Sequence, residues 1–191
     1  MHANRRWWLP AVAVVLAAAG CENFGAVEQG IVVGSEGGEL TLVLDSNPDG
    51  TPRYDRTPAV HVRIPADPDQ MGPAPQSGGL IRLDTKNRRV ILYSATEDRL
   101  LTVKFELLKD ARNVYPDDAR VARSGAPKVD RATGAVTLYA PRSRELVTIK
   151  APEAVLALPL DAWRAGDVVR YYFKDPGQAL RMMNVSQSKI G

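Results

Sequence analysis

Two stretches of this 191-residue chain, RLDTKNRRVILYSATEDRLLTVK (residues 82–104) and KVDRATGAVTLYAPRSRELVTIK (residues 128–150), align without a gap at a constant offset of 46 residues. Seven positions are identical in the two copies: Asp84/Asp130, Val90/Val136, Leu92/Leu138, Tyr93/Tyr139, Leu100/Leu146, Thr102/Thr148 and Lys104/Lys150. In each copy apolar and polar residues alternate on both sides of short turns, which predicts a hairpin followed by a further strand. Such a unit cannot bury its apolar face alone, so we expect the copies to pack on one another.

The same period-two alternation continues on both sides of the repeat. It is seen in ELTLVLD (39–45), AVHVRIP (59–65) and GDVVRYYFK (166–174), and VVGSEGGELTLV (32–43) is a weaker third copy of the hairpin. Turn-forming residues separate these runs, among them Gly37-Gly38 and Asp175-Pro176-Gly177. Glycine supplies the positive φ and proline the fixed φ that tight hairpin turns need.

The spacing of these short strands predicts the fold class. We expect a mainly β protein, an antiparallel barrel or sandwich built from repeated hairpin units, with an OB-like barrel as one possible form. Helix is expected only over residues 116–124, starting at Asp117, and over residues 152–158, stopping before Pro159.

The first twenty residues have the layout of a secretory signal peptide. Arg5 and Arg6 form a positive head, Trp7 to Leu16 form an apolar segment, and residues 17–20 are small. The apolar segment is too short for a permanent membrane span. The alternative, a buried N-terminal helix, is disfavoured by Pro10.

The tetrapeptide Ala18-Ala19-Gly20-Cys21 resembles the lipobox of bacterial lipoproteins, although that family prefers leucine where Ala18 stands. The resemblance implies that the leader is removed before Cys21 and that the thiol of Cys21 carries a diacylglycerol. The segments GDVVRYYF (166–173) and ALRMMNVS (179–186) resemble, more loosely, a lipoprotein family of sulfate-reducing bacteria, to which no particular chemistry is attached.

Lipidation at Cys21 would divide the chain into three parts. Residues 1–20 are the leader, residues 21–29 a lipidated tether, and residues 30–191 the β-rich domain. By resemblance to a sorting rule of enterobacterial lipoproteins, Glu22 after the cysteine favours the outer membrane, with the domain facing the periplasm. Export could follow the general route or the twin-arginine route, since Arg5-Arg6 resembles a twin-arginine signal.

Composition excludes several classes of function. The formal net charge is +3, and it falls to +1 when Arg5 and Arg6 leave with an acid-free leader, so nucleic-acid binding has no electrostatic basis. Cys21 is the only cysteine, and His61 is the only histidine beyond the leader. Disulfides, thiolate metal sites and multi-histidine sites are therefore not expected in the folded domain.

A calcium site is one candidate. The segment Asp45-Ser46-Asn47-Pro48-Asp49-Gly50 fits the start of a calcium loop, with Asp45, Asn47 and Asp49 as the oxygen ligands. The twelfth position holds Arg56 instead of glutamate, so the EF-hand form fails, but Asp55 could supply a later carboxylate. The alternative is an ordinary turn between strands, because these residue types are also the common turn formers.

Aromatic side chains near the C-terminus are a second candidate. Trp163 and Tyr172 could stack on a glycan, whereas Tyr171 and Phe173 on the opposite strand face are expected to pack in the core. Arg99, Arg142 and Arg144 occupy equivalent loops of the two repeats and could pair with anionic headgroups or cell-wall carboxylates.

No enzyme motif for nucleophilic, phosphate or dinucleotide chemistry is present. The leading hypothesis is a non-catalytic, lipid-anchored interaction or scaffold domain of the cell envelope with an envelope protein as partner. The alternatives are a glycan- or envelope-polymer-binding module, supported by calcium or not, and a hydrolase that uses two carboxylates. The interaction hypothesis predicts an exposed apolar or aromatic patch on one sheet face or edge.

Overall fold

The computed structural model describes residues 25–44 and 59–188. The predicted lipidation site Cys21 and the predicted calcium ligands Asp45, Asn47, Asp49 and Asp55 lie outside the described residues.

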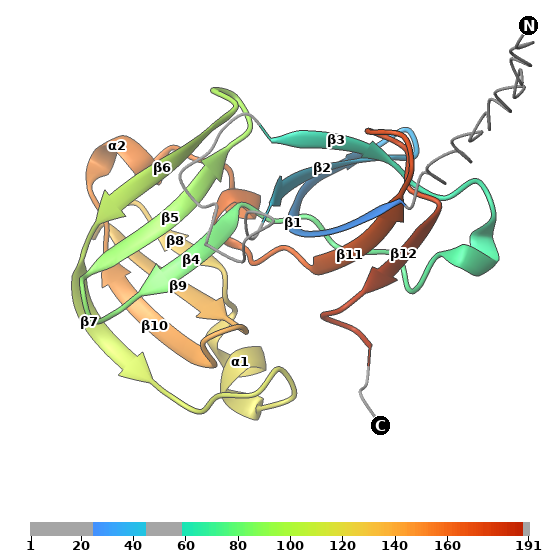
Figure 1. The fold of residues 1–191 in the computed structure, drawn as a ribbon. Coiled ribbons are helices and arrows are strands. Elements are labelled where there is room, and N and C mark those ends of the chain that lie inside the picture. Colours follow the sequence, from blue (N-terminus) through green and yellow to red (C-terminus); the bar gives the residue numbers. More distant parts are fainter. Residues whose placement is uncertain (1–24, 45–58, 189–191) are drawn as a thin grey trace, which may run out of the picture.

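The described residues form a mainly antiparallel β fold with little helix, as the sequence predicts (Figure 1). A five-stranded sheet has the order β12-β11-β1-β2-β3, a three-stranded sheet β4-β5-β6, and a four-stranded sheet β7-β10-β9-β8. The strands of the five-stranded sheet are β1 (Ala26–Glu36), β2 (Glu39–Leu44), β3 (Val60–Arg63), β11 (Val168–Phe173) and β12 (Arg181–Asn184). Those of the three-stranded sheet are β4 (Leu80–Asp84), β5 (Arg89–Ser94) and β6 (Arg99–Lys104). Those of the four-stranded sheet are β7 (Glu106–Ala111), β8 (Lys128–Asp130), β9 (Ala135–Ala140) and β10 (Glu145–Lys150).

The two copies of the sequence repeat are two equivalent three-stranded meanders. We call β4-β5-β6 unit one and β8-β9-β10 unit two; β5 and β9, like β6 and β10, begin and end at the offset of 46 residues. The turns match as well, because the residues with positive φ are equivalent: Arg88 (54°) with Gly134 (72°), and Asp98 (43°) with Arg144 (54°). The duplication in sequence is thus a duplication of backbone geometry.

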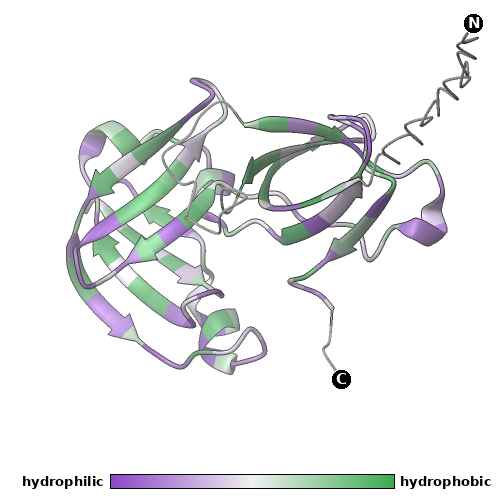
Figure 2. Cartoon of the chain, in the orientation of Figure 1, coloured by the Kyte–Doolittle hydropathy of each residue, from purple (hydrophilic) through white to green (hydrophobic). Residues whose placement is uncertain are grey.

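The two units pack face to face, so this half of the molecule is a sandwich. Val90 and Leu92 of unit one and Val136 and Leu138 of unit two are fully buried in one shared core. The chain passes from β6 to β7 through the buried Phe105, which links the two sheets along one side. Apolar and polar residues alternate along these strands in Figure 2, as half-buried strands require.

Two further cores involve the five-stranded sheet. On one face of that sheet, Leu42, Val62 and Met182 belong to one core cluster, which also includes part of the chain after β11. The other face, which we call the outer face, packs in part on unit one, where Ile31 and Val168 meet Tyr93. Unit one therefore lies between unit two and the five-stranded sheet, which covers part of its second face, around Ile81 and Tyr93.

Three boundary details differ from the sequence-based expectations. β1 begins at Ala26 and pairs with β11 from that residue on, so residues 26–29, predicted as tether, belong to the sheet. The helix predicted from Asp117 is α1 (Ala119–Ser124), and its cap is Asp118, whose carboxylate accepts from the backbone N–H of Arg120 at 2.8 Å. The second predicted helix is a single turn, α2 (Glu153–Leu156), followed after Pro159 by a 3₁₀ turn, η2 (Leu160–Trp163). Another 3₁₀ turn, η1 (Pro68–Gln70), follows β3.

Within residues 25–44 and 59–188, no helix is both long and apolar enough to cross a bilayer.

Candidate functional site

The part of the outer face that unit one leaves uncovered lies on β1, β11 and β12. Antiparallel register places two rows of side chains on it, since residues directly opposite each other share a face. The first row is Val27, Tyr172 and Arg181, and the second is Gln29, Arg170 and Met183. We call these six residues, with the adjoining Gln70 and Leu180, the basic-apolar face.

Large apolar side chains are exposed on the basic-apolar face. Val27 is 61% exposed, Leu180 45% and Met183 50%, and these are three of the six exposed large apolar residues among the described residues. These three residues line a groove of about 580 Å³. The other residues that line it are Gln70, Arg170, Tyr171, Tyr172 and Arg181. Exposed apolar side chains that gather in one groove are typical of an interaction surface, whereas isolated ones are ordinary.

The two arginines of this face have neutral partners. Arg170 donates to the side-chain oxygen of Gln29 from Nη2 at 3.0 Å and from Nε at 3.3 Å. Arg181 donates from Nε to the side-chain oxygen of Gln70 at 2.9 Å. Within the described residues neither guanidinium forms a salt bridge with a carboxylate. The glutamines orient the arginines without cancelling their charge.

A buried layer holds this face from behind. Tyr171 points to the opposite side of β11, where its hydroxyl donates to Glu28 at 2.7 Å and its ring centroid lies 5.4 Å from that of Phe173. Met182 of β12 is buried in the same layer. The outer edge of β12 is already occupied, because the N–H of Gly72 donates to the carbonyl oxygen of Met182 at 3.1 Å. A partner would therefore contact the side chains of the face and not extend the sheet by adding a strand.

The two aromatic residues predicted to bind a glycan lie in different environments. Tyr172 is half-buried and lines the groove of the basic-apolar face. Trp163 is fully buried in the core between the two units, and its indole N–H has no hydrogen-bond partner among the residues that the structure describes. Trp163 has no surface to offer a ligand, so the structure does not bring the two rings together.

The predicted arginine cluster is also dispersed. Arg99 pairs with Glu97 on its own turn. Arg144 lies over the ring of Tyr115, 4.7 Å from its centroid, and donates to the Tyr115 hydroxyl at 3.0 Å. Arg142 lines a separate cavity of about 380 Å³ between β4 and the β9–β10 turn.

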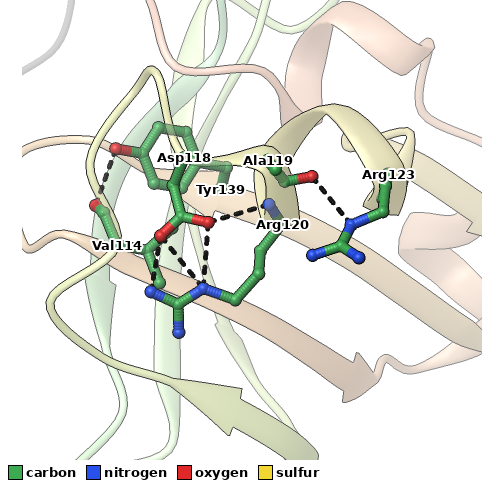
Figure 3. Close-up of polar contacts among 6 residues, drawn as sticks. All are labelled: Val114, Asp118, Ala119, Arg120, Arg123 and Tyr139. Atoms are coloured by element: carbon green, nitrogen blue, oxygen red, sulfur yellow. Dashed lines mark hydrogen bonds and ion pairs between the residues drawn. The ribbon is translucent and has the colours of Figure 1, made fainter.

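The pKa values of three side chains outside this face are shifted by burial or by hydrogen bonds. The Arg120 guanidinium, together with the Arg120 N–H, lowers the pKa of the Asp118 carboxyl to about 2 (Figure 3). Burial raises the pKa of Tyr139, whose hydroxyl donates to the carbonyl of Val114 at 2.9 Å (Figure 3). Burial, helped by a hydrogen bond to Asp98, raises the pKa of Tyr93 to about 12. None of these groups lines the groove.

No metal-binding cluster of three or more His, Cys, Asp or Glu side chains occurs in the part of the chain that the structure describes.

Sequence analysis missed Val27, Leu180 and Met183 as surface residues. Val27 lies in the segment predicted as tether, and no role is predicted for Leu180 or Met183. The period-two rule would have placed Met183 opposite to the buried Met182, and so on the face of Arg181. That the face stays uncovered depends on tertiary packing.

Comparison with known proteins identifies the family. Residues 23–191 match the family model described as Domain of unknown function (DUF4881), and the chain therefore belongs to that family. No curated protein and no solved structure matches the chain.

Proposed function

We propose that this member of the DUF4881 family is a bacterial lipoprotein, held in the cell envelope by a lipid on Cys21, whose folded domain is a non-catalytic interaction module. The outer membrane is the proposed site of anchoring, with the domain facing the periplasm. The basic-apolar face is the proposed contact surface for another envelope component.

The observation that carries this proposal is the division of the outer face into a covered and an uncovered part. Where unit one covers it, Ile31 and Val168 are buried. In the next rows along the same strands, Val27 and Met183 remain exposed. An apolar surface that continues directly from a packed interface, and then meets no further chain among the described residues, is suited to a partner.

The chemistry of the described residues supports a non-catalytic role. The shifted carboxyl groups, Asp84, Asp118 and Asp130, accept hydrogen bonds from residues two to five positions along their own turns. Their lowered pKa values follow from those bonds. A general acid or base would instead need its pKa moved towards neutral pH within a cavity.

A second candidate, binding of a glycan or envelope polymer, is favoured by Tyr172. Its half-buried ring, flanked by Arg170 and Arg181, could stack on a sugar whose acidic groups the arginines bind. Thermal unfolding with cell-wall fragments, with and without calcium, tests this candidate. A rise in melting temperature that Tyr172→Ala abolishes would favour it, and calcium dependence would point to Asp45, Asn47 and Asp49.

The anchor is tested on the native protein and on a Cys21→Ser variant. Mass spectrometry of the membrane-extracted protein should find an N-terminal, diacylated Cys21, and Cys21→Ser should move the protein to the soluble fraction. An intact leader with a free thiol on Cys21 contradicts the proposal.

The contact surface is tested with a photo-reactive amino acid placed at Leu180 or at Leu108. Both side chains are 45% exposed, but Leu108 lies on β7, away from the basic-apolar face, and is the matched control. Irradiation of intact cells should give a reproducible adduct with an envelope component from position 180 only. Equal labelling from both positions, or none, counts against this surface.

A further inference from the structure

We propose that the basic-apolar face lies against the anionic surface of the bilayer that holds the lipid. This inference rests on the proposed lipidation of Cys21 and names the envelope component that the face contacts. The domain is then seated on the membrane and does not hang freely from its anchor.

The first argument is the length of chain between the anchor and the sheet. β1 begins at Ala26, five residues after Cys21. Five residues span at most about 18 Å when fully extended. The next residue, Val27, already lies in the groove. A lipid on Cys21 therefore keeps the bilayer surface close to this face, whatever path the connecting residues take.

The second argument is the chemistry of the face. Val27, Leu180 and Met183 offer exposed apolar groups of a size that enters the headgroup region, and Tyr172 has the amphipathic ring that favours a membrane–water interface. Arg170 and Arg181 add two positive charges whose protein partners are glutamine oxygens. Guanidinium groups bind phosphate through paired N–H donors, which suits phospholipid headgroups.

The third argument is the position of negative charge. Glu28, in the middle of this region of β1, points to the opposite side of the sheet and accepts from Tyr171 there. None of the described residues that line the groove is acidic. The charges on the described groove lining are therefore the positive ones of Arg170 and Arg181, which suit an anionic surface. A protein partner is compatible with the apolar groups, but the short connection to the anchor favours lipid.

This orientation has a consequence for the rest of the molecule. The sandwich of units one and two lies beside the five-stranded sheet (Figure 1). Unit one packs on another part of the same outer face, at Ile31 and Val168, so a bilayer on the basic-apolar face would lie beside the sandwich of units one and two.

The test uses the mature, lipidated chain reconstituted into vesicles of phosphatidylcholine and phosphatidylglycerol. Cys21 is acylated in that protein, so an introduced cysteine is the only free thiol. An environment-sensitive fluorophore is attached at Met183→Cys, at Leu180→Cys in a second protein, and at Leu108→Cys as the control. Nitroxide-labelled lipids with the spin label near the headgroup then quench fluorophores that lie at the bilayer surface.

We expect lipid quenching to remove more than about half of the fluorescence at positions 183 and 180, and little at position 108, because only the first two lie at the interface. Replacing both arginines, Arg170→Gln with Arg181→Gln, should reduce quenching at position 183 several-fold in the anionic vesicles. Unchanged quenching in that double variant would overturn the electrostatic part of the inference.

The controls separate this inference from the proposed function. If mass spectrometry confirms the lipid on Cys21 but positions 183 and 180 are quenched no more than position 108, the membrane-seated orientation is wrong and the anchor stands. An adduct with a membrane protein from position 180, combined with absence of lipid quenching, would also overturn the inference. If Cys21 carries no lipid, the proposed function itself fails.

Discussion

Unit one and unit two have the same backbone design and different surroundings. Leu92 and Leu138 occupy equivalent positions and are both fully buried in the shared core. Their neighbours in sequence, Tyr93 and Tyr139, point the other way. Tyr93 is only 6% exposed because the five-stranded sheet covers it, whereas Tyr139 is half-buried on the outside of unit two.

The sequence differences between the units reflect this difference in burial. Ile91 of unit one packs against the five-stranded sheet. The equivalent residue of unit two is Thr137, whose hydroxyl is hydrogen-bonded to that of Thr148 at 3.1 Å. The second face of unit one is apolar where the five-stranded sheet covers it, and the equivalent part of unit two is more polar. The comparison teaches that a repeated meander keeps its turns and its inner face while its second face adapts to what covers it.

The largest expected effect tests the shared core. Leu92→Ala and Leu138→Ala should each lower the free energy of unfolding by about 3 kcal/mol, because each leaves a cavity in the same packed interior. Urea denaturation of the two variants measures both values. A loss at Leu138 well below the loss at Leu92 would mean that the units do not share one core.

The next prediction compares, at alkaline pH, the outward-facing tyrosines of the two units, Tyr93 and Tyr139. The pKa of Tyr93 is raised to about 12, above its unfolded value of 10, so the folded state keeps its proton when the unfolded state has lost it. The contribution of Tyr93 to the free energy of unfolding is therefore fully present below pH 10. The free energy of unfolding should fall by about 2 kcal/mol as the pH rises from 10 to 12.

Variants at the two tyrosines supply the contrast. Tyr93→Phe should remove most of this alkaline loss, and Tyr139→Phe should remove much less, since Tyr139 is only half-buried. Chemical denaturation at several pH values reports the stability, and absorbance of the phenolate reports the ionisation. Equal effects of the two variants would contradict the difference in burial.

A smaller effect tests the equivalence of the turns. Gly134 has a φ of 72°, and a Cβ added there would meet its nearest atom at an ordinary 3.5 Å, so Gly134→Ala is strained only by its backbone. We expect a loss of about 1 kcal/mol.

The reverse change in the other unit should have the opposite sign. Arg88 has a φ of 54° without being glycine, and Arg88→Gly should therefore gain up to about 1 kcal/mol. Thermal unfolding of both variants is the measurement. A loss of stability in Arg88→Gly would show that the two turns are not equivalent.

The smallest effect concerns the aspartates that open these turns. The side chain and N–H of Asn87 lower the pKa of Asp84, and those of Thr133 lower the pKa of Asp130. Both folded values lie below 3.8, so the stabilisation is present above that pH and is lost as the pH falls through the folded pKa.

Asp84→Asn and Asp130→Asn should therefore each lose a little stability at neutral pH and show less further loss on acidification. Carboxyl NMR titration of the unmodified chain should place both pKa values below 3.8. An ordinary pKa for one aspartate and a lowered pKa for the other would contradict the equivalence of the two turns.

Much of the fold could be predicted because it depends on local rules. Alternation in residues 82–104 and 128–150 determined the strands, and the aspartates and glycines between them determined the turns. The candidate site was predictable only in part. Tyr172 was named from its aromatic character, but Trp163, named with it, is buried in the core. Composition cannot tell a ligand-facing ring from a core ring.

By itself, the sequence determined which residues of each strand share a face, because side chains on a strand alternate with period two. It also determined that the two repeat units form the same meander. Only the tertiary structure decided that the five-stranded sheet covers part of the second face of unit one, and that Val27 and Met183 remain exposed on the outer face of that sheet within the described residues. The physical reason is that alternation specifies two faces for every strand, whereas what packs against each face depends on residues far away in the chain.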